Sequence, residues 1–294
     1  MIRYDPETNC FSSNATVFGE LPQVMWHITS KCNMDCRFCF NDKDVRNEEL
    51  YLTLDFRAIT LKLKELGVQK VDISGGEPLL FDKLPDLVKA CADNGLYVTI
   101  TTNGSGAAHT SGWLLENWKM FSRIIVSIDG LEHEHTYLRS NTVAFSNAIG
   151  FCKRLKDMGC SRFRLNTVVT KCIISGAYYR EFCAEIRRIE PNEWCLIQPH
   201  PSCQKSTFKA VEITAEEFDN FSANCIKEMS GSGVKLLFRP IRVYSTYWTL
   251  SANGILTYGD ESNAVRLSLL DDGVEEIKNV ISQYKQLLPE DAIL

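Results

Sequence analysis

The chain has 294 residues, of which 45% are hydrophobic and 23% charged, proportions that are ordinary for a globular protein with a full core. A formal net charge of −5 argues against a surface that binds nucleic acid by neutralising its phosphates. The sequence has neither an apolar signal region nor a run approaching 18 apolar residues, so we expect no membrane attachment and a cytoplasmic location. In that compartment, the 12 cysteines favour free thiols or metal ligands over disulfides.

Short β-rich runs alternate with longer amphipathic segments along most of the chain. The predicted strands are residues 24–29, 70–74, 96–102, 123–128, 162–169 and 193–198. The predicted helices are residues 56–66, 83–93, 112–119, 143–158 and 176–189. This alternation predicts parallel β/α units, and six of them predict an α/β fold, a partial (β/α)6 barrel of TIM type.

The predicted barrel divides the chain into three parts. Residues 1–22 form an N-terminal extension, residues 23–200 the barrel core, and residues 201–294 a C-terminal extension that closes the barrel and carries a helix near 273–287. Ligands bind such folds at the C-terminal ends of the parallel strands. The unusual residues of this sequence lie at those ends.

The first of these unusual features is a cysteine loop that follows the first predicted strand. Cys32, Cys36 and Cys39 have the spacing C-x3-C-x2-C, and a 4Fe–4S cluster normally takes four thiolates. Three ligands from one loop would leave one iron open for another molecule. The alternative is a zinc knuckle, but structural zinc needs four protein ligands, and only His27 and Asp35 are nearby candidates for the fourth. We therefore favour the cluster.

The second feature is the sequence SGGEP at the end of the second predicted strand. Two adjacent glycines let the backbone approach a ligand closely, and a carboxylate beside them can receive an ammonium group. The alternative interpretation is a simple turn before a helix. Together with the cysteine loop, the segment favours a ligand site formed by Ser74, Gly75, Gly76 and Glu77.

These two motifs resemble the radical S-adenosylmethionine (SAM) superfamily, and the resemblance covers roughly residues 23–200. In that family SAM chelates the open iron, and an injected electron cleaves it to methionine and a 5′-deoxyadenosyl radical. The resemblance implies a 4Fe–4S cluster, SAM, and an electron donor such as flavodoxin or ferredoxin. It implies that Arg139 pairs with the methionine carboxylate, a role that suits a planar guanidinium. Further implied cofactor contacts are Phe38, Asn103, Ser127, Asp129, Asn166 and Val168.

Within the superfamily the sequence resembles the viperin-type nucleotide dehydratases. The segments WHITSKCNMDCRFCF, KVDISGGEPLL, FRLNTVV and EWCLIQ carry this resemblance in chain order. Enzymes of that type abstract a hydrogen from the ribose of a nucleoside triphosphate and eliminate water. The resemblance implies that Lys70 binds phosphate and that Tyr247 lies near the ribose. His200, after the sixth predicted strand, is a further candidate for contact with the substrate.

Some substrate positions depart from the viperin-type pattern. The chain has Met25, Glu193 and Cys195 where that pattern has an asparagine, an arginine and a lysine. Strand alternation places positions 193 and 195 on the same side, which we expect to face the substrate. Because a carboxylate repels a triphosphate in a partly desolvated pocket, we expect a less charged substrate.

Two other functions remain open on the sequence. The segments SIDGLEHEHTYLRSN and SANGILTYGD also resemble the twitch or SPASM enzymes that modify peptides or sugars. No cysteine follows Cys225, so we expect no auxiliary cluster of that kind. A non-catalytic iron–sulfur protein that senses SAM or redox state is the other alternative. We predict that most of the remaining cysteines are structural, and that His133 and His135 are solvated residues of a loop.

Overall fold

A computed structural model describes most of the chain, namely residues 2–5, 10–13, 15–18, 21–39, 54–200, 206–241, 248–259, 264–284 and 286–289. Its main feature is a curved sheet whose parallel strands follow one another in chain order. These strands are β4 (Gln23–His27), β5 (Lys70–Ser74), β6 (Tyr97–Thr102), β7 (Arg123–Ser127), β8 (Phe163–Val168), β9 (Glu193–Ile197) and β10 (Lys235–Arg239). The predicted strands are thus present to within two residues at each end.

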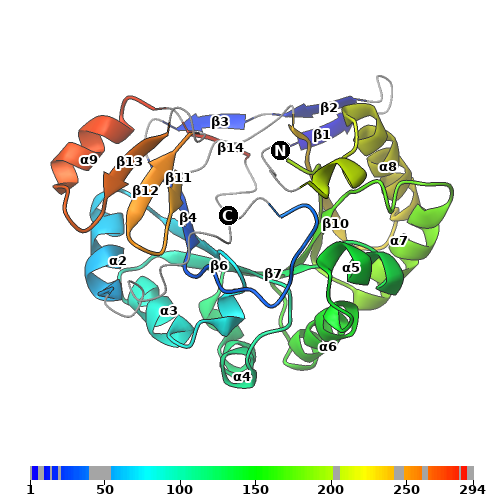
Figure 1. The fold of residues 1–294 in the computed structure, drawn as a ribbon, viewed down its shortest axis with the longest axis horizontal. Coiled ribbons are helices and arrows are strands. Elements are labelled where there is room, and N and C mark those ends of the chain that lie inside the picture. Colours follow the sequence, from blue (N-terminus) through cyan, green and yellow to red (C-terminus); the bar gives the residue numbers. More distant parts are fainter. Residues whose placement is uncertain are drawn as a thin grey trace.

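Helices cover the outer, convex face of the sheet (Figure 1). The helices between the parallel strands are α2 (Phe56–Glu65), α3 (Leu84–Asp93), α4 (Ala108–Glu116), α5 (Glu132–Arg139), α6 (Ala144–Asp157), α7 (Tyr178–Ile189) and α8 (Ala215–Glu228). Short 3-10 turns occupy Pro78–Leu80, Trp118–Met120 and Phe208–Ala210. This alternation confirms the predicted α/β class and partial barrel.

The C-terminal region extends the sheet on the far side of β4. Strand β11 (Trp248–Leu250) pairs parallel to β4, and β12 (Ile255–Tyr258) and β13 (Val265–Ser268) continue the sheet in antiparallel pairing. In the described part of the chain, β10 and β13 are the two edges, so the barrel stays open. The predicted domain boundaries stay a prediction.

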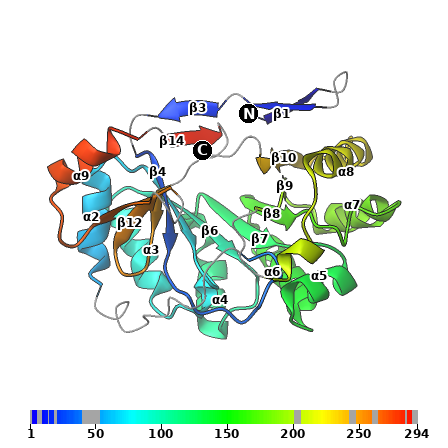
Figure 2. The same cartoon turned by 45° about the horizontal axis from the view of Figure 1, so that its top comes forward.

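Two smaller sheets and one helix complete the described structure. Strand β1 (Ile2–Asp5) pairs with β2 (Cys10–Ser13), and β3 (Ala15–Phe18) pairs with β14 (Gln286–Pro289). Both small sheets lie beyond the end at which β4 begins (Figure 2). Helix α9 (Val274–Ile281) precedes β14 and is shorter than the predicted helix near 273–287. None of the helices in the described ranges is long and apolar enough to cross a membrane.

Among the α-helices and strands from β4 to β10, three were not predicted, and each has a physical reason. Helix α5 is short and its sequence EHEHTYLR is polar, so it resembles a loop. Helix α8 did carry a signal, a capping box in which Thr214 and Glu217 exchange side-chain and backbone hydrogen bonds. Strand β10 has only five residues with charges at both ends, yet it pairs along its full length with β9.

Alternation along the parallel strands separates the core from the inside of the barrel. Side chains such as Trp26 and Ile73 point outward and are buried between the sheet and the helices. The residues that alternate with them, including His27, Asp72 and Ser74, line the concave face. Because side chains on successive residues of a strand point to opposite faces, the two sets are distinct. The chemistry of this protein therefore lies on the concave face.

Candidate active site

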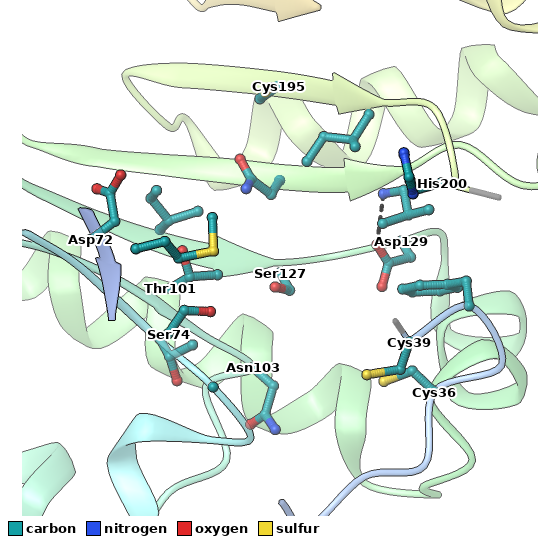
Figure 3. Close-up of a pocket in the computed structure, with 18 of the residues that line it drawn as sticks. Cys36, Cys39, Asp72, Ser74, Thr101, Asn103, Ser127, Asp129, Cys195 and His200 are labelled. Carbon is teal, nitrogen blue, oxygen red and sulfur yellow. Dashed lines mark hydrogen bonds between the residues drawn. The ribbon is translucent and has the colours of Figure 1, made fainter. Parts of the chain in front are cut away.

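The concave face surrounds a cavity of about 400 Å³. In Figure 3 the labelled side chains run from Asp72 at one end of the cavity to Cys36 and Cys39 at the other. The cysteines belong to the loop that follows the C-terminal end of β4, whereas Asp72 lies in the middle of β5. The cavity thus extends from the C-terminal ends of the strands into the barrel.

The cysteine loop is held by backbone hydrogen bonds to helix α5. The amide nitrogens of Asp35 and Arg37 donate to the carbonyl oxygens of Arg139 and Leu138 at 3.2 and 2.9 Å. All three cysteines of the loop line the cavity, and burial raises the pKa of the Cys36 thiol to about 11. A metal that binds this thiol must therefore displace its proton.

The donor set of this loop fits a cubane cluster. Within the described ranges, no three His, Cys, Asp or Glu side chains converge around a point where one metal ion would bind. A cubane does not require such convergence, because each thiolate binds a different iron. The three thiols share one end of one cavity, which is the arrangement that a three-ligand cluster needs.

The glycines of SGGEP pack against the cysteine loop itself. The amide nitrogens of Gly76 and Glu77 donate to the carbonyl oxygens of Thr29 and Lys31 at 2.6 and 2.7 Å. A Cβ atom on Gly75 would lie 2.4 Å from the Thr29 carbonyl oxygen, and one on Gly76 would lie 1.9 Å from that of Lys31. The sequence predicts that these glycines allow close approach of a ligand. The structure shows a close approach of backbone to backbone, while cofactor contact stays a prediction.

We expect Gly76→Ala to displace the cysteine loop, because the added methyl group meets backbone that cannot rotate away. Overpacking of this kind costs about 1–3 kcal/mol or more of unfolding free energy. The iron content after reconstitution should fall together with stability. Gly150→Ala is the control, since its Cβ meets nothing within 4 Å in helix α6 and alanine there should stabilise by about 0.5–1 kcal/mol. Full iron content in Gly76→Ala would contradict this account.

Glu77 is buried and ties the end of β5 to the end of β6. Its Oε1 accepts hydrogen bonds from the Leu79 amide and the Thr102 hydroxyl, and its Oε2 accepts from the Asn103 amide at 2.7 Å. Burial raises the pKa of Glu77, although these donors oppose that shift. Glu77 therefore holds the turn together, and its predicted contact with the SAM ammonium stays a prediction.

Asp129 holds Arg139 at the cluster end of the cavity. Its Oδ2 accepts hydrogen bonds from Nε and Nη2 of Arg139, both at 2.6 Å, and its Oδ1 accepts from the Val168 amide at 2.8 Å. Burial opposes the charge of Arg139, but Asp129 outweighs that effect and raises the pKa of the guanidinium. Both carboxylate oxygens of Asp129 thus accept hydrogen bonds from other residues of the protein. Its direct contact with SAM stays a prediction.

Both histidines predicted in a solvated loop lie on helix α5, where His135 is fully buried. His133 is exposed, as predicted. The Asp129 amide donates to Nδ1 of His135 at 2.9 Å, so the imidazole supports the same turn that positions Asp129. Burial lowers the pKa of His135 to about 4, with the Arg139 charge acting in the same direction.

Stability should therefore fall as the pH falls from about 6.5 toward 4. An unfolded histidine binds its proton near pH 6.5, so in this window the unfolded state carries more protons. Between about pH 7.5 and pH 5, His135 should contribute a loss of about 2 kcal/mol. His135→Asn keeps an acceptor but cannot titrate, so denaturant unfolding of the protein without its cluster should show a smaller loss. Because His27 has the same depressed pKa, the difference between the variants isolates His135. Equal losses of stability in the unmodified protein and in His135→Asn would contradict the assignment of this loss to His135.

Most predicted site residues meet around the cavity. Those that line it include Phe38, Lys70, Ser74, Asn103, Ser127, Asn166, Val168, Cys195 and His200. Tyr247 lies outside the described residues. Other polar residues of the lining were not predicted, namely Gln23, Asp72, Arg123, Arg164, Gln198 and Arg239. Their signal was strand alternation, since Arg123 and Arg164 have the same parity as Ser127 and Asn166.

The contacts of Glu193 correct the predicted repulsion between its carboxylate and a triphosphate. Its Oε2 lies 2.9 Å from Nε of Arg123 and 2.8 Å from Nε and Nη2 of Arg164, and its Oε1 lies 3.5 Å from Nζ of Lys235. Burial opposes its charge, but the guanidiniums of Arg164 and Arg123 hold the pKa of Glu193 below its usual value. The carboxylate thus faces cations of the protein. It is therefore not the uncompensated charge on which the predicted repulsion depends.

Residues 26–177 match the family described as the radical SAM superfamily. The chain belongs to the radical SAM superfamily. This membership agrees with the predicted radical SAM enzyme, and the predicted 4Fe–4S cluster and SAM are the cofactors of that superfamily. The cavity, with its three thiols and the Arg139–Asp129 pair, is where those cofactors fit.

The chain is 31% identical over 222 residues to an S-adenosylmethionine-dependent nucleotide dehydratase of Lacinutrix mariniflava, a match that spans 71% of this chain and 45% of the relative. It is 32% identical over 163 residues to a probable GTP 3′,8-cyclase of Pyrobaculum aerophilum, spanning 52% and 49%. The chain spans about half the length of these relatives.

The fold is similar to that of Streptococcus suis SuiB, whose crystal structure holds S-adenosylmethionine. The TM-score is 0.66 at 16% identity, over 88% of this chain and 66% of that one. At this identity the similarity concerns the fold alone. It agrees with the partial barrel described above.

Proposed function

We propose that the chain is a radical SAM enzyme that removes water from a nucleotide or nucleoside, as viperin-type enzymes do. The observation that carries the proposal is the 31% identity with a nucleotide dehydratase over 71% of this chain. The second relative is also named for a reaction of a nucleotide. The cavity is also suited to an anionic ligand such as a nucleotide, because cationic side chains line it deep in the barrel, beyond the cysteine loop.

The residues divide the cavity into a cofactor end and a substrate end. Cys32, Cys36 and Cys39 would hold the cluster, which would supply the electron for reductive cleavage of SAM. Arg139, held by Asp129, is oriented to pair with the methionine carboxylate. The substrate then lies between this end and Lys70, which burial and neighbouring guanidiniums drive toward a lower pKa despite Asp72 at 3.6 Å.

An anaerobic assay of the reconstituted enzyme tests this function. Nucleosides, monophosphates and triphosphates of the four bases are each supplied with SAM and a flavodoxin- or ferredoxin-type reductant. We expect 5′-deoxyadenosine together with a nucleotide product that has lost one water, detected by mass spectrometry. Turnover of a peptide or sugar instead would support the twitch or SPASM alternative. SAM binding without any 5′-deoxyadenosine would support the sensing alternative.

A further inference from the structure

A second cavity, of about 280 Å³, lies between helices α4 and α6 beside the cysteine loop. The loop after β6, the start of α4, one face of α6 and Asn33 form its lining. Among the described residues, none lines both this cavity and the one on the concave face of the sheet. Asn33 stands between Cys32 and Cys36 in the sequence, so the second cavity borders the loop that carries the predicted cluster ligands.

Two asparagines form a wall of this cavity, and their amide groups are already engaged within the protein. Nδ2 of Asn33 donates to the carbonyl oxygen of Ser105, and its Oδ1 accepts from Nδ2 of Asn103 at 2.9 Å. Nδ2 of Asn141 donates to the carbonyl oxygen of Asn33, and its Oδ1 accepts from the Val143 amide, both at 3.0 Å. The wall is thus fixed by the protein itself, and the groups that can bind a ligand lie elsewhere in the cavity.

The start of α4 offers hydrogen-bond donors that lack acceptors. No side chain caps this helix, and within the described ranges no group accepts from the amides of Ala108, His109 and Thr110. Ser111 in the same turn lines the cavity and is 4% exposed, and its hydroxyl has no partner in those ranges either. The buried hydroxyl of Ser105 also lacks one. Unsatisfied donors at the N-terminus of a helix favour an anion.

Arg154 gives the cavity a positive charge. It follows Asn147 by seven positions on α6, which places both residues on one face of that helix, and both line the cavity. In the part of the chain that the structure describes, no carboxylate forms a salt bridge with Arg154, whose guanidinium carbon lies 5.6 Å from the ring centroid of Phe151. No other charged side chain stands among the described lining residues. The cavity therefore combines a cation with the positive end of a helix.

We propose that this second cavity binds a small organic anion whose carboxylate or phosphate group lies at the start of α4. The helix amides and the Ser111 hydroxyl donate hydrogen bonds to its oxygens, and Arg154 at the exposed rim attracts its charge. The volume is near the lower limit of ligand pockets, so the occupant is a small metabolite. The site is separate from the cavity of the proposed reaction, and the inference does not depend on that reaction.

Equilibrium dialysis of labelled inorganic phosphate against the reconstituted protein, with SAM present, tests the site. Because the cavity on the concave face can also hold phosphate, the decisive quantity is the difference between variants. Ser111→Asp places a carboxylate where the anion would lie, and like charges in contact repel, so affinity at this site should fall by at least about tenfold. Ser161→Asp makes the same change at an exposed position before β8 and should leave phosphate binding unchanged.

Arg154→Gln tests the site without placing a new group in a buried position. Phosphate binding should weaken by about two- to fivefold, the effect expected for an exposed charge. Lys153→Gln, at the preceding exposed position of α6, is its control and should leave the affinity unchanged. Competition by acetate and by methyl phosphate distinguishes a carboxylate ligand from a phosphate ester.

A loss of affinity in Arg154→Gln at an unchanged melting temperature would support the site even if Ser111→Asp failed to fold. Failure of phosphate and acetate to bind would overturn the inference. Binding that neither Ser111→Asp nor Arg154→Gln weakens would overturn it as well, because the anion would then lie elsewhere in the protein.

Discussion

Replacing Cys36 by alanine will abolish the cluster and all cleavage of SAM. The unmodified chain should bind about four iron and four sulfide after anaerobic reconstitution, because it has one three-cysteine loop. Cys36 is the middle ligand of that loop, and its thiol faces the cavity beside Cys39 (Figure 3). Two remaining thiolates cannot hold an ordered cluster with one open iron. Iron and sulfide analysis, together with 5′-deoxyadenosine formation, measures both losses.

Cys152→Ala is the matched control for this experiment. Cys152 is also buried, at 1% exposure, but it packs in the apolar core on helix α6, away from the loop. This variant should lose some stability and keep its iron. Retained SAM cleavage in Cys36→Ala would contradict the assignment of the loop as the cluster site. Iron well above four per chain would mean that other cysteines bind a second cluster.

Arg139→Lys should weaken SAM binding by about tenfold or more while the fold is kept. Lysine preserves the positive charge opposite Asp129, but it loses the planar fork whose Nε and Nη2 both contact that carboxylate at 2.6 Å. A charge-assisted hydrogen bond contributes about 1.5–3 kcal/mol, which corresponds to roughly tenfold or more in affinity. Equilibrium binding of SAM to the reconstituted protein, with circular dichroism as a check of folding, measures the effect.

The control for Arg139 is Arg188→Lys at an exposed position of α7, where the arginine pairs with Glu185 one turn away. It should leave SAM binding unchanged, since exposed ion pairs contribute little. Asp129→Asn provides a second test of the same contact. It should loosen Arg139 and weaken SAM binding, with added instability because the buried guanidinium loses its counter-charge. Unchanged SAM affinity in Arg139→Lys would mean that the methionine carboxylate binds elsewhere.

The sequence alone was sufficient to predict a feature wherever that feature depends on residues close together in the chain. The spacing of Cys32, Cys36 and Cys39 allows one loop to supply three ligands whatever surrounds it. Likewise, each strand and helix has its own periodicity, so the alternating β/α order and the partial barrel could be predicted without knowing which residues meet. Local signals were weaker at α5 and β10, where short, charged segments adopt their structure through packing against neighbours.

Tertiary structure alone decided which side chains pair inside the barrel. Glu193 seemed a charge that would repel a phosphate, until the sheet placed it against Arg164 and Arg123, 29 and 70 positions earlier in the chain. Asp129 was predicted as a cofactor contact, and only the fold shows that helix α5 also brings Arg139 to its carboxylate. Alternation along a strand fixes the face of a residue. Its neighbours on that face depend on the register between strands that whole helices separate, and that register is set by packing of the entire sheet.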